Sequence, residues 1–292
     1  MIFPRKAFDN ISRLCILSPF DYGAAIYDDC SQDMAAQIEA VQYEAAKLTS
    51  GAMHLTSRED TLLELGWTDM ATRRNYFKLS LAHRGRYNQL SARLADYFVA
   101  RGTNQAAGAR VTRSAMANVM VVPSCNTSLR QGSVLVDSLR RWNNLDRDLR
   151  DIPNINGFKT RFKSHWPTSY KPYMGGSRIA GVHHTRMRLG FSQLNRDLYL
   201  RGCEASPICS QCQSGLDETY AHYLLKCSKY DLARSVLIFS SLDSEGHPTS
   251  VNQFDDEALV HLLLKGLVGE DNLTNVRLFR SVHTYISSTK RF

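Results

Sequence analysis

Four residues near position 220 have the types and the spacing of a metal site. Cys209 and Cys212 form a C-x2-C pair, and His222 and Cys227 form a His-x4-Cys pair nine residues further on. A C-x2-C turn brings two thiolates to one ion, and the second pair completes a tetrahedron. Thiolate and imidazole together favour Zn2+, with iron as the alternative. The pattern therefore predicts one Zn2+ ion, and because four protein ligands leave no open position we expect it to be structural.

The spacing also constrains the chain around His222. Thr219 is placed to cap a short helix that carries His222. Cys227 lies five residues further on, about 140° round an ideal helix. This helix must therefore end or bend near Lys226 for both side chains to reach one ion. We expect Leu224 and Leu225 to pack beneath the ion, because so small a metal segment needs an apolar floor.

The cysteine content favours reduced thiols over disulfides. Seven cysteines are an odd number, and three of them crowd into residues 209–227 beside a histidine. Cys203 lies six residues before Cys209 and is expected to stay outside the metal site, because it could join only by breaking the C-x2-C pair. The remaining cysteines are expected to be buried thiols: Cys15, Cys30 and Cys125.

The rest of the chain is predicted to be mainly α-helical. Apolar residues recur at helical spacing over residues 31–50, and Thr56-Ser57-Arg58-Glu59 has the sequence of a capping box that opens a shorter helix. Residues 119–122 are a strand candidate, and residues 167–181 and 241–253 are expected to be loops. Further helices are expected around residues 68–81, 90–98, 135–145, 158–166, 187–200, 230–239 and 259–267.

These patterns predict a helical bundle, followed by a basic helical segment and a small CCHC zinc knuckle. The predicted regions are a helical region at 1–100, a linker at 101–128, a basic helical region at 129–202, the knuckle at 203–240 and a helical tail at 241–292. No run of about 20 apolar residues is present, and the first residues lack the apolar core of a signal peptide. We therefore expect an intracellular chain, cytoplasmic or nuclear, without a membrane partner.

The positive charge is concentrated in one part of the chain. The formal net charge is +8, and residues 129–201 hold fourteen Lys and Arg against five Asp. Such a local excess favours nucleic acid as a partner through phosphate contacts, and the alternative is an ordinary solvated charged face. Three thiolates give a zinc site a formal charge near −1, so nearby bases would have to attract phosphate: Arg201, Lys226, Lys229 and Arg234.

Two other pairs of residues could do chemistry, and both have simpler interpretations. Tyr27-Asp28-Asp29 is similar to the paired aspartates of reverse transcriptases, but Ile26 stands in place of the aromatic residue. Only twenty-seven residues precede Asp28, which leaves no room for the third carboxylate of a two-metal site. We therefore expect a capped helix-to-loop junction there. The adjacent pair His183-His184 is expected to lie at the surface.

The order of the motifs resembles the part of LINE-type, non-LTR retrotransposon reverse transcriptases that lies downstream of the polymerase palm. The motifs similar to thumb-side helices of that family are Asp21-Tyr22-Gly23, Ile38-Glu39-Ala40-Val41-Gln42, Leu48-Thr49-Ser50-Gly51-Ala52, Leu62-Leu63-Glu64-Leu65-Gly66-Trp67, Arg73-Arg74, Trp142-Asn143-Asn144-Leu145 and Phe158-Lys159. The motifs similar to its C-terminal zinc knuckle are Arg186-Met187-Arg188-Leu189-Gly190, the cysteines, and Glu218-Thr219 before His222. The resemblance covers most of residues 10–235.

This resemblance implies a role in holding template RNA or target DNA beside a polymerase, without sequence preference. The chain lacks the palm aspartates, so we expect it to be the C-terminal part of such an RNA-directed DNA polymerase, with no polymerase activity alone and with the missing polymerase domains as partners. The residues expected to bind nucleic acid are Arg140, Arg141, Arg161, Lys163, Arg186, Arg188, Arg201, Lys226 and Lys229.

Two other functions are compatible with the sequence. The first is a stand-alone protein-interaction module, in which the zinc knuckle and the helices bind another protein and the basic segment is incidental. The second is a metalloenzyme, which is disfavoured because all four ligands are protein side chains and no catalytic Glu motif accompanies them.

Overall fold

The computed structural model describes residues 3–100, 118–168, 170, 173, 175–240, 255–267 and 272–292. This part of the chain is mainly helical, and it contains the isolated β-bridges Ala100–Met120 and Ile208–Asp217 but no strand. The predicted mainly α-helical class is therefore confirmed, while the strand candidate at 119–122 contributes only a bridge. No described helix is both long and apolar enough to cross a membrane.

The chain forms two compact units, each assembled from separated stretches of sequence. Unit 1 comprises residues 1–14, 43–67 and 168–292, and unit 2 comprises residues 15–42 and 68–167. The predicted regions are contiguous in sequence, so their boundaries do not follow this division. The predicted linker at 101–128 and the predicted loop at 241–253 lie largely or wholly outside the described residues.

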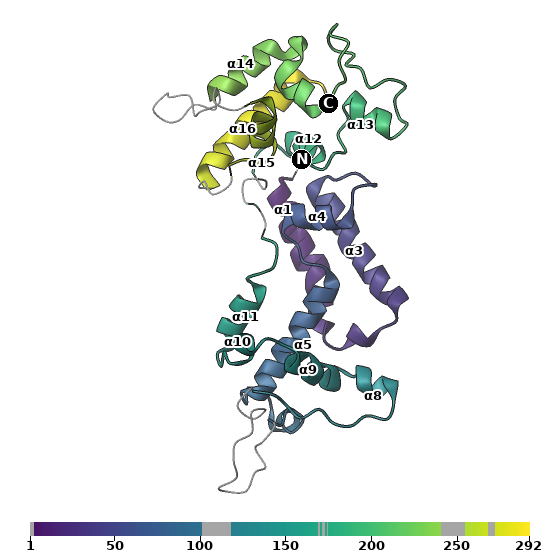
Figure 1. Cartoon of the computed structure of the whole chain (residues 1–292), viewed down its shortest axis with the longest axis vertical. Helices are drawn as coiled ribbons and strands as arrows, with labels where there is room; N and C mark the ends of the chain where they lie inside the picture. Colours follow the sequence, from purple (N-terminus) through teal and green to yellow (C-terminus); the bar gives the residue numbers. More distant parts are fainter. Residues whose placement is uncertain are drawn as a thin grey trace. The chain divides into compact units, whose positions relative to one another are not determined.

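Unit 2 is built around the helix α5, Met70–Arg86, which packs against α9, Val134–Asn143, and α11, Ile155–Lys163 (Figure 1). Leu79, Trp142 and Phe158 from these three helices are at most 2% exposed and form its core. The predicted helix at 90–98 is reduced to one turn. The shorter elements are α2 Ser18–Gly23, η2 Tyr27–Asp29, α6 Ala92–Ala95, α8 Ser128–Gly132 and α10 Arg147–Arg150; α3, Gln32–Ser50, begins in this unit.

A buried charge network in unit 2 includes Asp28, the first of the two paired aspartates. Lys78, only 2% exposed, lies 2.6 Å from a carboxylate oxygen of Asp28 and 2.6 Å from one of Asp137. Arg74 donates to Asp28 at 2.6 Å. Burial raises the pKa of Asp28, but the hydrogen bonds from Lys78 and Arg74 outweigh it and hold that pKa below its ordinary value. Asp28 therefore serves as an internal counter-ion.

Unit 1 places the predicted metal segment and the C-terminal helices in one core. The packed helices are α12, Arg178–Arg188, α14, Asp231–Ser240, α15, Asp256–Lys265, and α16, Asn272–Thr289 (Figure 1). Sequence reasoning predicted α14 and α15 but not α16. The core joins Tyr223 and Leu224 of the metal segment to Phe279 and Val282 of α16. The C-terminal region is therefore part of the same core as the metal segment, not a separate tail.

A buried ion cluster joins three other segments of unit 1. Glu64 lies in α4, Arg58–Leu65, and accepts from Arg5 of α1, Arg5–Ile11, at 2.9 Å and from Arg188 at 2.6 Å. All three side chains are no more than 6% exposed. Burial raises the pKa of Glu64, but the two guanidinium groups outweigh it and hold the pKa below its ordinary value. This carboxylate is the counter-ion of two buried cations.

Local helix signals agree closely with the structure. Ser57, rather than Thr56, caps α4 by accepting from the Asp60 N–H at 3.0 Å, and Gly66 ends the helix in the left-handed conformation at φ 61°. Asp69 caps α5 by accepting from the Thr72 N–H at 2.7 Å.

Predictions that depended on long-range packing fared less well. The helix predicted at 187–200 is two helices, α12 and α13, Asn195–Leu200, because Gly190 at φ 70° separates them, and α12 begins inside the predicted 167–181 loop. The expected surface location of His184 is wrong, since its Nε2 lies 3.0 Å from the Leu263 carbonyl in the core. Cys15 is exposed and the side chains of Cys30 and Cys125 are half-buried, so these thiols are not the buried ones expected.

Glu64→Gln tests the buried ion cluster. The substitution keeps the shape but removes the negative charge beside two buried guanidinium groups, so we expect unfolding free energy to fall by about 3 to 5 kcal/mol. Urea unfolding of the purified chain measures it. The control is Glu44→Gln, which breaks an exposed pair with Lys47 and should cost less than about 1 kcal/mol. Equal losses in both variants would contradict this interpretation.

Candidate metal centre

A tight hairpin positions the first two ligands. Its ends are joined by hydrogen bonds from the Cys209 N–H to the Leu216 carbonyl at 2.9 Å and from the Glu218 N–H to the Pro207 carbonyl at 2.8 Å. The chain reverses with Gly215 at φ 70°, a conformation that favours glycine. The loop between these bonds carries both Cys209 and Cys212, as a C-x2-C turn requires.

A single distorted turn positions the other two ligands. The Thr219 hydroxyl accepts from the His222 N–H at 3.0 Å, and the π-helical turn η4 spans His222–Lys226. Cys227 follows in an extended conformation, with φ −66° and ψ 116°. The predicted cap and the predicted helix end near Lys226 are therefore confirmed. Leu224 is fully buried beneath the site, also as expected, whereas Leu225 is only partly buried.

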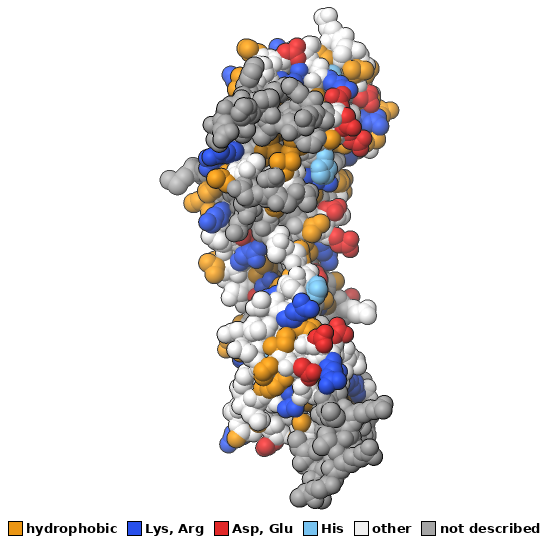
Figure 2. Space-filling model, turned by 60° about the vertical axis from the view of Figure 1, so that its left-hand side comes forward, with side chains coloured by type: hydrophobic (Ala, Val, Ile, Leu, Met, Phe, Trp, Pro, Cys, Tyr) orange, Lys and Arg blue, Asp and Glu red, His pale blue; other side chains and the backbone are white. Residues whose placement is uncertain are grey.

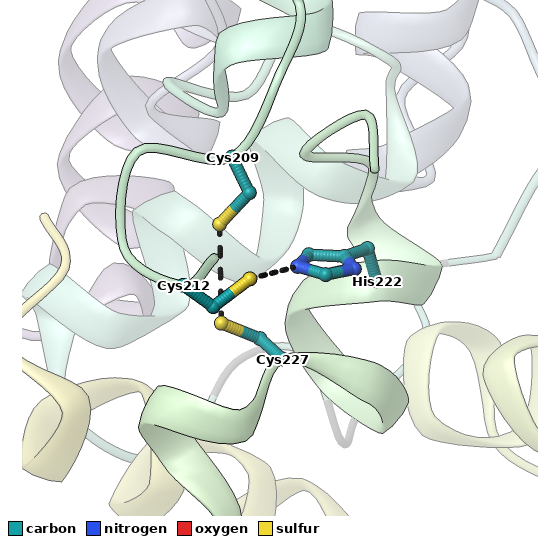
Figure 3. A group of neighbouring side chains, drawn as sticks. All are labelled: Cys209, Cys212, His222 and Cys227. Atoms are coloured by element: carbon teal, nitrogen blue, oxygen red, sulfur yellow. Dashed lines mark hydrogen bonds between the residues drawn. The ribbon is translucent and has the colours of Figure 1, made fainter. Parts of the chain in front are cut away.

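The four side chains point toward one another (Figure 3), and all their ligand atoms lie within 4.8 Å of one another. The Sγ atoms of Cys209 and Cys227 are 3.9 Å apart, and Cys212 Sγ lies 3.4 Å from His222 Nε2. A tetrahedral zinc site requires about 3.8 Å between two sulfurs and about 3.6 Å between sulfur and nitrogen at ordinary bond lengths. The donor set and its spacing therefore fit one Zn2+ ion.

Backbone N–H donors surround the three sulfurs. Backbone N–H groups donate to every one of them, and such bonds stabilise a negative sulfur more than a neutral thiol. The donors are the N–H groups of Gln211 and Cys212 to Cys209, of Ser214 to Cys212, and of Lys229 to Cys227.

Burial and hydrogen bonding act on these thiols in opposite directions. Hydrogen bonds from the Ser214 hydroxyl and N–H hold the pKa of Cys212 at about 6. Burial raises the pKa of Cys209, and it raises that of Cys227 to about 12. A cation among the sulfurs would offset this cost of burial. Cys203 is exposed and is not part of the cluster.

Arg234 of α14 supports the second ligand pair from inside the core. Its Nε donates to the Leu224 carbonyl at 2.9 Å, and its Nη2 donates to the Cys227 carbonyl at 2.7 Å. Sequence reasoning treated Arg234 as a phosphate contact, but the residue is only 9% exposed. Its role is to hold the chain on both sides of Lys226 in place. No local sequence pattern marks this role, because the partners are carbonyl groups.

Glu218 ties the hairpin to the end of the chain. It is fully buried, and both of its carboxylate oxygens accept from Arg291 at 2.6 Å. The hydrogen bond to Glu218 raises the pKa of Arg291 above its ordinary value. Glu218 also accepts from the Asn195 N–H at 2.8 Å. Sequence reasoning noted Glu218 only as part of a motif, and the pairing with Arg291 fixes the hairpin that holds Cys209 and Cys212.

No protein-family model, no curated protein and no solved structure matches this chain. The resemblance to retrotransposon reverse transcriptases therefore stays a prediction from the motifs. The metal centre rests on its own geometry.

Several residues expected to bind nucleic acid have internal partners. Arg188 is buried against Glu64. Arg186 donates from Nε to the Gly51 carbonyl at 2.9 Å, and Arg201 donates from Nε to the Asp197 carbonyl at 2.9 Å. Two further residues pair with carboxylates: Arg141 with Asp137 at 2.5 Å and Lys226 with Asp256 at 2.8 Å.

The other expected contacts remain available to a ligand. Arg140, Arg161 and Lys163 of unit 2, and Lys229 of unit 1, are exposed. Within the described part of the chain, none of these four makes a salt bridge. Four of the nine expected residues are therefore exposed and lack a salt bridge within the described residues, and nucleic-acid binding by all nine stays a prediction.

Metal removal should unfold the metal segment rather than merely change its surface. We expect the purified chain to carry one Zn2+, and stripping it with a chelator should lower the melting temperature and expose Tyr223, because the segment shares its core. A colorimetric zinc assay and near-ultraviolet circular dichroism measure both effects. Cys209→Ser should reproduce the loss, while Cys203→Ser should retain the metal. A chain that is equally stable without metal would contradict a structural role.

Arg234→Lys tests the support of the metal ligands. Lysine keeps the charge but cannot donate to two carbonyl groups in the same fork geometry, so we expect zinc affinity to fall by about 10- to 100-fold. Competition with a chromogenic chelator measures the affinity. Arg277→Lys is the matched control, because Arg277 is exposed on α16 and should leave zinc affinity unchanged. Unchanged affinity in Arg234→Lys would rule out the positioning role.

Proposed function

We propose that the protein binds nucleic acid without sequence preference and that one structural Zn2+ stabilises unit 1. The four converging ligands support the zinc. When bound, the ion would cross-link the hairpin to η4 and leave no open position for water or substrate. Its formal charge with three thiolates is near −1, so contact with phosphate would fall to basic side chains.

Free basic charges on the helices of unit 2 carry the nucleic-acid proposal. Arg140 of α9 and Arg161 and Lys163 of α11 are exposed and make no salt bridge among the described residues. On the face drawn in Figure 2, the described Lys and Arg side chains lie among acidic, apolar and polar ones and do not form one continuous patch. A few dispersed phosphate contacts, rather than a deep basic groove, are therefore the proposed mode.

The aromatic residues near these bases favour packing over base stacking. Tyr76 is 4% exposed, and its ring centroid lies 5.7 Å from that of Phe162 and 5.3 Å from that of Trp166. Lys163 Nζ lies 4.3 Å from the centroid of Tyr76. Because these rings pack against one another, they leave little exposed ring face on which a base could stack. Binding through phosphates alone is expected to be independent of sequence.

We further propose that the nucleic-acid-binding surface of unit 2 serves a retrotransposon RNA-directed DNA polymerase, with this chain as the C-terminal part of that enzyme. The ordered motifs and the CCHC ligand spacing support this proposal. The polymerase active site would then lie in domains other than the described ones, since Asp28 is an internal counter-ion.

Arg140→Glu with Arg161→Glu tests the interface. We expect affinity for a single-stranded RNA oligonucleotide to fall at least about tenfold, and the log–log salt slope to decrease by about two because two phosphate contacts are lost. Fluorescence anisotropy between about 50 and 200 mM salt measures both. The control, Lys265→Glu with Arg277→Glu, makes the same change in net charge on exposed residues of unit 1. Equal losses in both variants, or an affinity that is flat in salt, would refute the proposed interface.

A further inference from the structure

A groove of about 570 Å3 lies in unit 1 between α14 and α16. Its α14 wall is apolar and open to solvent: Leu232 is 83% exposed and Val236, one helical turn further on, is 55% exposed. These two adjacent apolar side chains form a small exposed apolar surface on the wall of a groove, which a partner could cover. The proposed nucleic-acid-binding residues of unit 2 do not line this groove.

The opposite wall is polar and positive. Arg280 and Thr284 of α16 line it one helical turn apart, and Lys229 lines the groove at the start of α14. Neither Arg280 nor Lys229 makes a salt bridge with another described residue, and no carboxylate is among the described residues that line the groove. The groove therefore offers an apolar stripe beside two positive charges that no described carboxylate pairs with.

The chemistry of the two walls distinguishes between partners. A nucleic-acid strand would pair its phosphates with Arg280 and Lys229 but would leave the apolar wall uncovered, because Tyr230 and Tyr285 of the groove are only 5% and 2% exposed and offer no open face to a base. An amphipathic helix fits better, because apolar residues at i and i+4 match Leu232 and Val236, and acidic residues along one flank match Arg280 and Lys229.

We propose that the groove between α14 and α16 binds an amphipathic peptide helix of a partner protein, with its apolar face on α14 and an acidic flank on α16. The apolar contacts supply most of the buried area, and the charge pairs set the orientation of the helix. Arg234 fixes α14 to the metal segment, so the apolar wall is held by the core before the partner arrives.

The test uses the full zinc-loaded chain and a fluorescein-labelled synthetic peptide of about four helical turns, with Leu at positions i, i+4 and i+7 and Glu along one flank. A second peptide carries Lys in place of each Glu. Fluorescence anisotropy gives the dissociation constants for the native chain, Leu232→Ser, Arg280→Glu and the matched control Arg277→Glu. Arg277 is exposed on the same helix but does not line the groove.

We expect the acidic peptide to bind the native chain and Arg277→Glu alike, and to bind Leu232→Ser and Arg280→Glu at least about tenfold more weakly. The basic peptide should prefer Arg280→Glu, because the charge pair is then reversed. No binding to the native chain, or equal binding by Arg277→Glu and Arg280→Glu, would overturn the proposal. Displacement of the peptide by oligouridine, with the same dependence on Arg280, would assign the groove to nucleic acid instead. Circular dichroism confirms that each variant is folded.

Discussion

The close approach of ionisable sulfurs in a buried corner is the constraint on which unit 1 depends. The Sγ atoms of Cys209 and Cys227 lie 3.9 Å apart, and both residues are at most 3% exposed. Two thiolates at this distance repel each other strongly in a medium of low dielectric constant. Burial outweighs the backbone N–H donors around them and raises the pKa of both thiols. A divalent cation would offset both the repulsion and the cost of burial, and this is the strongest physical reason for proposing zinc at the site.

The core around this corner explains why the metal and the C-terminal helices belong together. Tyr223, which lies between the ligands His222 and Cys227 in sequence, is fully buried, and its hydroxyl lies 2.7 Å from the Thr289 hydroxyl of α16. Arg291 at the end of the chain holds the hairpin through Glu218. The two loops that carry the ligands thus pack against the C-terminal part of unit 1, so the free energy of binding a metal there would contribute to the folding of the whole unit.

Features set by neighbouring residues were predictable from the sequence, and features set by distant partners were not. The Asp69 cap, the left-handed Gly66 and the stop at Lys226 each depend on a few adjacent residues, and so does the spacing of the four metal ligands. Arg188 was expected to reach solvent, but its partner Glu64 is 124 residues away in sequence. His184 and Arg234 were misjudged for the same reason, because their partners are carbonyl groups brought near by packing. The α16 helix was missed although Val276, Phe279, Val282 and Ile286 have helical spacing.

Contacts between distant residues also determine how much of the positive charge of the chain is available to a ligand. Residues 129–201 carry fourteen basic residues against five acidic ones, and a count of this kind treats every base as surface. Arg188 forms a salt bridge with the buried carboxylate of Glu64, and Arg141 forms one with Asp137. Arg186 and Arg201 donate hydrogen bonds to backbone carbonyl groups. Arginine suits these internal roles because its planar fork reaches two acceptors and stays charged when buried. Much of the basicity of this sequence therefore stabilises the fold, and a polyanion would meet only the few bases that the fold leaves unpaired. Because each phosphate contact adds only about one unit to the log–log salt slope, an interface of few contacts should bind weakly, which suits accessory binding beside another nucleic-acid-binding domain better than a specific receptor.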